Sequence, residues 1–173
     1  MAEALFASER RMVREEKEQL LQLVGFTIGK EQFGVDILMV QEIIREAPIT
    51  VVPNSPDFVE GVINLRGNII PVIELRKRLN LYTDTVKKED IWILILDLGG
   101  RITGFIVDSV TEVLKIQEST IEPAPEIVVA GLENQYIRGV CDIGEQLLIL
   151  LDFDRILLLE EVNKLKSMDK SKG

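Results

Sequence analysis

Few side chains in this sequence could carry out covalent chemistry. The chain has no histidine, which is the commonest general base and transition-metal ligand in proteins. It also lacks the Gly-x-Ser-x-Gly motif that places a hydrolase nucleophile. Residues 25–30, Gly-Phe-Thr-Ile-Gly-Lys, are only faintly similar to a phosphate-binding loop. One residue too few separates the two glycines, and Glu31 stands where Ser or Thr would bind magnesium.

Carboxylates are the remaining candidates for acid–base or metal chemistry. Asp152 and Asp154 precede an apolar repeat of helical spacing, where an N-cap and a first-turn acid explain both. Asp97, Asp108 and Asp142 lie near the ends of predicted strands and lack the spacing of metal ligands. The sequence therefore predicts no catalytic residue, no metal site and no cofactor, and it favours binding over catalysis.

Composition narrows the kind of partner and the compartment. The 173 residues carry a net charge of -9, which argues against nucleic acid and anionic membrane surfaces because both attract clustered Lys and Arg. Cys141 is the only cysteine, so no internal disulfide is expected and a reducing compartment is favoured. The charged N-terminus lacks a signal-peptide pattern, and the apolar run 91–96 is too short to span a bilayer.

The elements that would position binding residues are predicted to be short strands. Strands are expected at residues 20–28, 32–36, 40–45, 59–65, 68–73, 91–98, 101–107, 110–116, 136–140 and 146–151. Arg66-Gly67 and Gly99-Gly100 supply hairpin turns, and Asp152 is the expected N-cap of a C-terminal helix. So many short strands predict a small sandwich or barrels, which close to remove exposed sheet edges.

Two segments of the chain repeat in the same order. Residues 61–64, Gly-Val-Ile-Asn, correspond to Gly-Val-Cys-Asp 78 positions later, and the same offset relates residues 72–75 to residues 150–153. Upstream, residues 40–44 resemble residues 110–114. The order predicts two similar subdomains, each of about five strands closed by a short helix. Chance similarity between apolar strands is the competing explanation.

One stretch is too specific to be a generic strand pair. Residues 61–76, Gly-Val-Ile-Asn-Leu-Arg-Gly-Asn-Ile-Ile-Pro-Val-Ile-Glu-Leu-Arg, resemble the signature of CheW-like domains. The preceding residues 53–58, Pro-Asn-Ser-Pro-Asp-Phe, and the segment 33–43 fit the same family. Downstream, Val-Asp-Ser-Val at 107–110 and Pro-Ala-Pro-Glu at 123–126 also fit. The resemblance covers roughly residues 20 to 157.

The resemblance implies a mainly β fold with two SH3-like five-stranded β-barrel subdomains, short helices and a C-terminal helix. On this expectation residues 19–82 form the first barrel, and residues 83–158 form the second barrel with its closing helix. Residues 1–18 would be a charged N-terminal tail, either free or packed on the second barrel. Residues 159–173 would be the helix end and a tail.

The resemblance also implies partners. CheW-like coupling proteins are non-enzymatic adaptors that bind the cytoplasmic tips of chemoreceptors and the regulatory domain of the histidine kinase CheA. They alternate with the kinase in rings beneath receptor arrays, where other CheW-like domains are further ring partners. The expected location is therefore the cytoplasm, with recruitment to membrane-associated arrays, no contact with nucleic acid and no direct insertion into the membrane.

Six residues match positions with a family role. The resemblance assigns Val40, Gly61 and Arg66 to the receptor, and Ile37, Glu42 and Ile127 to the kinase. Arg66 is the sharpest candidate, because a planar side chain with five donors stands at a turn that Asn or Asp would serve. Each position also has a structural explanation: core packing for Val40 and Ile37, a bulge at Gly61, and solvated charges at Arg66 and Glu42.

Three other functions stay open on the sequence. The first is a CheW-like coupling module of a non-chemotactic pathway, such as motility or surface sensing. The second is a small enzyme that uses acidic residues and a metal, which the missing histidines disfavour. The third is an SH3-like barrel that binds nucleic acid, which the negative charge disfavours.

Overall fold

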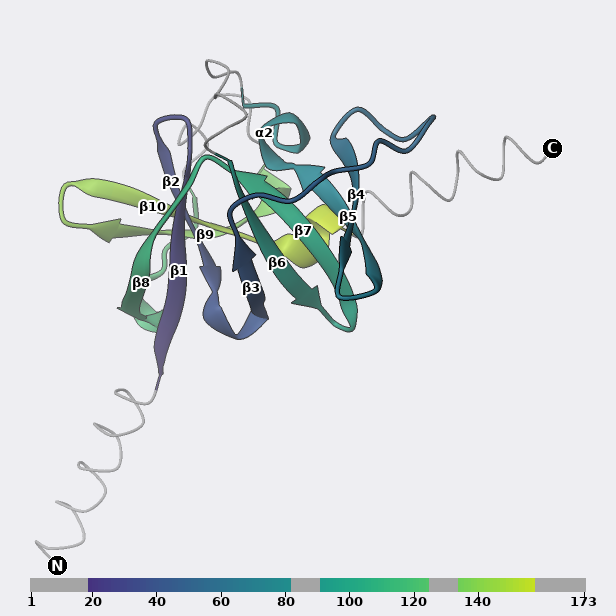
Figure 1. The fold of residues 1–173 in the computed structure, drawn as a ribbon. Helices are drawn as coiled ribbons and strands as arrows, with labels where there is room; N and C mark the ends of the chain where they lie inside the picture. Colours follow the sequence, from purple (N-terminus) through teal and green to yellow (C-terminus); the bar gives the residue numbers. More distant parts are fainter. Residues whose placement is uncertain (1–18, 82–90, 125–133, 158–173) are drawn as a thin grey trace, which may run out of the picture.

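Short strands dominate the residues that the computed structural model describes, which are 19–81, 91–124 and 134–157 (Figure 1). The strands are β1 (Leu20–Ile28), β2 (Glu31–Asp36), β3 (Val40–Ile44), β4 (Val59–Leu65), β5 (Asn68–Glu74), β6 (Trp92–Leu98), β7 (Arg101–Val107), β8 (Ser109–Gln117), β9 (Ile137–Ile143) and β10 (Gln146–Leu151). Short helices are η1 (Ile37–Met39), α2 (Leu75–Arg78), η3 (Glu118–Thr120) and η4 (Asn134–Tyr136). Residues 153–157 are also helical. The predicted mainly β class with short helices is confirmed.

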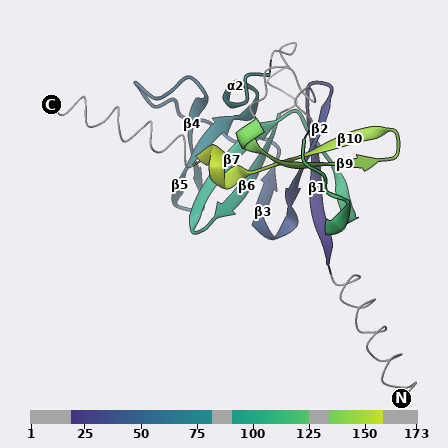
Figure 2. The same cartoon turned by 180° about the vertical axis from the view of Figure 1, so that it is seen from behind.

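The strands form two five-stranded sheets. The β1 sheet has the order β8-β1-β2-β10-β9, and the β6 sheet has the order β3-β6-β7-β5-β4. One parallel pair occurs in each, β2 with β10 and β5 with β7, while the other pairs are antiparallel. Figures 1 and 2 show the two sheets side by side, with α2 near one end of the molecule.

Each sheet takes strands from both halves of the chain. Strands β1 and β2 pair with β8 and β10, whereas β6 and β7 pair with β3 and β5. The expected boundary between residues 82 and 83 therefore does not separate the two sheets. The physical reason is that the repeats offer equivalent edges. Sequence similarity shows which strands are alike, but not which of two equivalent edges a strand will join.

The internal repeat is visible in the strand boundaries. Strands β4 and β9 are related by the offset of 78 residues, since Val59–Leu65 becomes Ile137–Ile143. The register agrees, because Ile63 opposite Ile70 corresponds to Cys141 opposite Leu148. Replacing β1 to β5 by β6 to β10, and the reverse, converts the order of one sheet into that of the other. The fold is thus built from two similar repeats, and each repeat contributes strands to both sheets.

In both sheets, the chain segment that follows one edge strand pairs with the edge strand at the other end. After β3 the chain returns to the outer edge of β4, where Thr50 and Val62 exchange two backbone hydrogen bonds of 2.9 Å. After β8, Glu122 and Val140 exchange two bonds of 2.8 Å on the edge of β9. Both outer edges are thereby partly paired, which reduces the unpaired backbone that would invite other strands.

The largest core lies between the sheets. Four phenylalanines are fully buried there, and Phe153 packs edge-on against Phe105 with ring centroids 5.0 Å apart. A smaller apolar cluster belongs to each sheet, and Cys141 is a buried member of one of them. Phe153 belongs to the helical segment that Asp152 begins, where the Arg155 backbone N–H donates to Asp152 Oδ1 at 3.2 Å. The predicted N-cap at Asp152 is confirmed.

Candidate partner-binding site

Arg66 has a left-handed backbone conformation, which is unfavourable for residues other than glycine. It is the first central residue of the β4–β5 turn, with φ of 53°, and Gly67 follows with φ of 86°. Two positive φ values in a two-residue turn match the twist of a hairpin. The turn is held by Asn64, whose Oδ1 accepts from the Gly67 backbone N–H at 2.9 Å.

The other hairpins use glycine at the equivalent place. Gly29, Gly99 and Gly144 begin the turns β1–β2, β6–β7 and β9–β10 with φ between 61° and 65°. A residue with a side chain costs roughly 1 to 2 kcal/mol in this left-handed region, whereas glycine adopts it freely. An arginine that keeps an unfavourable conformation points to a role for its side chain.

The side chain of Arg66 reaches across the β6 sheet to Glu42. Arg66 Nη2 lies 3.2 Å from Glu42 Oε1, so the turn after β4 is linked to β3 at the opposite end of the strand order. The Arg66 side chain is 77% exposed and that of Glu42 29%. Such a pair contributes about 0 to 1 kcal/mol, because water screens it. Because the Arg66 side chain is largely exposed, its guanidinium remains accessible to a partner.

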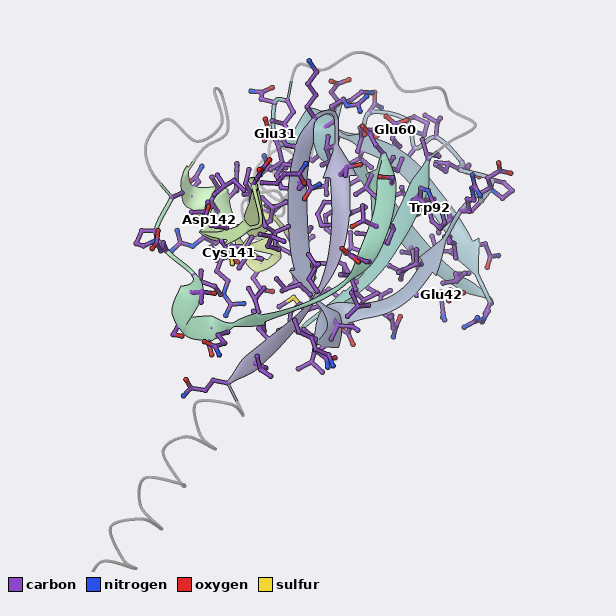
Figure 3. All side chains as sticks on the ribbon, turned by 90° about the vertical axis from the view of Figure 1, so that its left-hand side faces the viewer. Glu31, Glu42, Glu60, Trp92, Cys141 and Asp142 are labelled. Atoms are coloured by element: carbon purple, nitrogen blue, oxygen red, sulfur yellow. The ribbon has the colours of Figure 1, made fainter. Side chains whose placement is uncertain are left out.

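A hollow lies beside this ion pair. Its volume is about 310 Å³, and its lining combines an apolar part with a polar rim. The lining residues are Leu65, Ile70 and Ile102 on the apolar side, and Gln41, Glu42, Arg66 and Asn68 on the polar side. The apolar members belong to or pack on the core of the β6 sheet. Figure 3 shows Glu42 on β3 at one rim of the molecule, on the opposite side from Cys141 and Asp142.

Arg66 and Glu42 were expected to serve different partners, and the structure brings them into contact. Any protein that engages Arg66 will also approach Glu42. The sequence contains no direct signal for this contact, because the two residues are separated by 24 positions and meet only when the sheet has formed. The two residues, expected in different interfaces, are therefore neighbours on one surface.

Gly61 has a backbone role. It is a buried residue at a β-bulge of β4 with φ of 151°, and a Cβ there would lie 2.1 Å from the Thr50 carbonyl oxygen. The close approach permits the Thr50–Val62 hydrogen bonds that close the β6 sheet. Gly139, its equivalent in β9, also faces such a return segment, with Glu122 O 3.0 Å from a Cβ. The structural explanation given for Gly61 is therefore the one that its geometry supports.

Val40 and Ile37 are half-buried and pack on the core between the sheets. Between them, Leu38 is 88% exposed in η1, and its backbone N–H donates to Asp36 Oδ1 at 3.0 Å. Sequence reasoning missed Leu38, because an Ile-Leu-Met run gives no sign of which residue points outward. In the three-residue helix η1, the side chain of the middle residue points into solvent. Ile127 lies outside the described residues.

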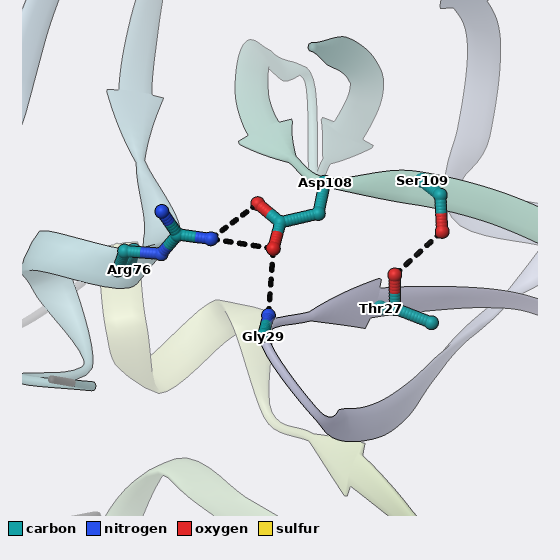
Figure 4. Close-up of polar contacts among 5 residues, drawn as sticks. All are labelled: Thr27, Gly29, Arg76, Asp108 and Ser109. Atoms are coloured by element: carbon teal, nitrogen blue, oxygen red, sulfur yellow. Dashed lines mark hydrogen bonds and ion pairs between the residues drawn. The ribbon is translucent and has the colours of Figure 1, made fainter. Parts of the chain in front are cut away.

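A partly buried ion pair joins the two repeats (Figure 4). Arg76, from α2, forms an ion pair with Asp108, which lies between β7 and β8, and both side chains are less than one-fifth exposed. Asp108 Oδ2 also accepts from the Gly29 backbone N–H at 2.6 Å in the β1–β2 turn. Next to it, the hydroxyls of Thr27 and Ser109 are hydrogen-bonded to each other. These contacts fix α2 against both sheets.

A second cation lies between aromatic rings from the two repeats. The Arg78 guanidinium carbon is 5.0 Å from the Phe58 ring centroid and 4.8 Å from that of Tyr136. Phe58 and Tyr136 are equivalent positions, and their carbonyl oxygens accept from the backbone N–H groups of Glu74 and Asp152. The cation–π contacts stabilise the junction by roughly 0.5 to 2 kcal/mol each.

The pKa values of two ionisable side chains next to this junction are raised. Burial, with a smaller effect of Glu60, raises the pKa of the Glu74 carboxyl above its ordinary 4.5. The hydrogen bond from Lys77 Nζ to Glu60 Oε1, 2.8 Å long, raises the pKa of the Lys77 ammonium. Among the described residues, no group of three or more His, Cys, Asp or Glu side chains is placed to hold a metal ion. No helix in the described ranges is long and apolar enough to cross a bilayer.

The comparison with known families is decisive. The model of the CheW-like domain matches residues 22–161. The chain belongs to this family. The CheW-like chain is 40% identical over 146 residues to the chemotaxis protein CheW of Klebsiella aerogenes. The aligned region covers 84% of this chain and 87% of that relative. It is 35% identical over 144 residues to the chemotaxis protein CheW of Helicobacter pylori, with 83% and 86% covered.

A solved structure gives the same result for the fold. The CheW-like chain is similar to the scaffolding protein TtCheW from Thermoanaerobacter tengcongensis, with a TM-score of 0.72 and 36% identity. The similarity covers 79% of this chain and 91% of that one. The predicted family and the pair of SH3-like five-stranded barrels are confirmed. The family and these relatives support a chemotaxis coupling adaptor, a scaffold class rather than an enzyme class.

Proposed function

We propose that this CheW-like chain couples the cytoplasmic tips of chemoreceptors to the histidine kinase CheA through the regulatory domain of the kinase. In this role it supports kinase activation and the assembly of receptor arrays in the cytoplasm, next to the membrane. Other CheW-like domains are further partners in rings. Family membership supports the class of function, and the conformation of Arg66 is the observation that carries the proposal.

The receptor contact is assigned to the surface around Arg66. Its guanidinium is mostly exposed, and its backbone keeps a conformation that glycine would adopt at lower energy. Val40 contributes from β3, on the same strand as Glu42. Gly61 contributes indirectly, because it permits the backbone contact with Thr50 that closes the sheet carrying Arg66.

The kinase contact is assigned to η1 and to Ile127. Ile37 anchors η1 on the central core, and the adjacent Leu38 presents an apolar side chain to solvent. An exposed apolar residue four positions before the charged Glu42 suits a protein interface with a polar rim. Because Glu42 contacts Arg66, the two assigned surfaces meet at this ion pair.

A reconstituted array tests the proposal. Receptor fragments, CheA and the chain are combined, and kinase autophosphorylation is measured with the wild type, Arg66→Ala and the control Arg155→Ala. Arg155 is also an exposed arginine with one carboxylate neighbour, Asp152, at 3.7 Å. We expect kinase activation by the wild type and the control, and a marked loss with Arg66→Ala while its fold is retained. A folded wild type that neither binds nor activates the kinase would overturn the proposal.

A further inference from the structure

The hollow beside Arg66 has the size and lining of a pocket for one side chain. Its volume of about 310 Å³ is larger than the roughly 150 Å³ apolar cavity that is known to hold benzene. Leu65, Ile70 and Ile102 provide an apolar wall that is continuous with the core of the β6 sheet. An apolar group that entered the hollow would gain the burial free energy that these side chains offer.

The charges at the rim favour an acidic partner. Among the described residues, Arg66 is the only charged donor that lines this hollow, and its side chain is 77% exposed in a chain of net charge -9. Its described acceptor is a single oxygen of Glu42 at 3.2 Å, although a guanidinium has a planar face that binds both oxygens of a carboxylate. A carboxylate from outside could therefore form the better, two-pronged contact.

The adjacent outer edge of β4 disfavours a partner that adds a strand there. The outer edge of β4 is already paired at Val62, where Thr50 takes both the N–H and the carbonyl group. A helix does not need a free edge, and it places residues three or four positions apart on one face. A helical partner could thus direct an apolar side chain into the hollow and a carboxylate at Arg66 at the same time.

We propose that the hollow accepts one apolar side chain of an amphipathic helix, and that a carboxylate three or four positions away on this helix replaces Glu42 as the partner of Arg66. The inference rests on the proposed function, since the helix is a segment of the receptor tip. Glu42 then acts as a competitor that holds Arg66 in place until the receptor binds. An ion-pair exchange of this kind adds little net affinity but selects partners with a correctly placed acid.

Two variants test the two halves of the inference by calorimetric titration with a receptor-tip fragment. Glu42→Gln removes the competing carboxylate, and we expect binding to tighten by up to about fivefold. Gln41→Trp fills the hollow from its exposed rim, and we expect binding to weaken by about tenfold or more. Glu145→Gln and Gln146→Trp are the matched controls, because they make the same two substitutions at exposed positions of the β9–β10 hairpin.

The outcomes separate this inference from the function on which it rests. Tighter binding by Glu42→Gln and weaker binding by Gln41→Trp, with both controls equal to wild type, supports it. Weaker binding by Glu42→Gln, or full affinity of a folded Gln41→Trp, overturns it while the adaptor function stands. Absence of binding by the wild type contradicts the proposed function itself. Circular dichroism confirms that each variant is folded before the titration.

Discussion

Arg76 and Asp108 form a partly buried ion pair that links the first repeat to the second. Asp108 accepts a 2.6 Å hydrogen bond from Arg76 Nη2 through Oδ1 and another 2.6 Å bond from the Gly29 backbone N–H through Oδ2. One carboxylate thus connects α2, the β1–β2 turn and the β7–β8 junction. Because the repeats exchange strands, this connection holds together segments that the chain order would separate.

Asp108→Asn should destabilise the fold by about 2 to 3 kcal/mol, since it removes a charged acceptor shared by Arg76 and the Gly29 backbone N–H. The control is Glu42→Gln, which breaks the exposed pair with Arg66 and should change stability by no more than about 1 kcal/mol. Urea unfolding measures both values. Equal effects of the two substitutions would show that the Arg76–Asp108 pair does not fasten the repeats.

Gly61→Ala should destabilise the chain by more than about 2 kcal/mol, because its Cβ would collide with the Thr50 carbonyl at 2.1 Å. Gly139→Ala should cost less, since its closest contact is the side chain of Ile121 and its backbone oxygen contact is 3.0 Å. Thermal unfolding ranks the two variants. If Gly61→Ala unfolds at the wild-type temperature, the sheet closure is more adaptable than the geometry implies.

Arg66→Gly should leave the free energy of unfolding unchanged or raise it by up to about 1 kcal/mol, because glycine relieves the left-handed conformation. Asn68→Gly, in the extended strand two residues later, should instead lower it by about 0.5 to 1 kcal/mol. Denaturant unfolding compares them. A clear loss of stability in Arg66→Gly would mean that the Arg66 side chain is kept for the fold.

The raised pKa of Glu74 should make the free energy of unfolding depend on pH. Its pKa is raised in the folded state, so folded Glu74 keeps a proton at a pH where the unfolded chain has lost it. Its contribution is fully present below the ordinary pKa of 4.5 and is lost as pH rises through the folded-state pKa. The stability of wild type minus that of Glu74→Gln should therefore fall as pH rises above about 4.5. Urea unfolding along this pH series would contradict the assignment if the difference rises.

The sequence predicted the elements well because turn residues separate apolar runs of strand length. Nine of the expected strands agree with the structure to within one residue at each end. The strand expected at 136–140 extends instead over Ile137–Ile143. Asp142, expected near a strand end, is an exposed residue inside β9, which continues to the turn at Gly144.

The site was less predictable because its geometry depends on pairing between distant segments. The motif around Arg66 was visible, but its contact with Glu42 and the hollow beside it need the closed β6 sheet. The exchange of strands between the repeats had no signal in the sequence, since either edge would suit β3 or β8. The exposure of Leu38 depends on a single helical turn, which apolar periodicity does not predict.

A heteronuclear NMR titration of the labelled chain tests the central claim most directly, with a receptor-tip fragment in one series and the regulatory domain of CheA in another. The adaptor account predicts that the receptor fragment perturbs signals around Val40 and Arg66, and that the kinase domain perturbs signals around Ile37 and Leu38. Glu42 should respond to both, because it lies where the two surfaces meet. Unchanged spectra with both partners would contradict the account.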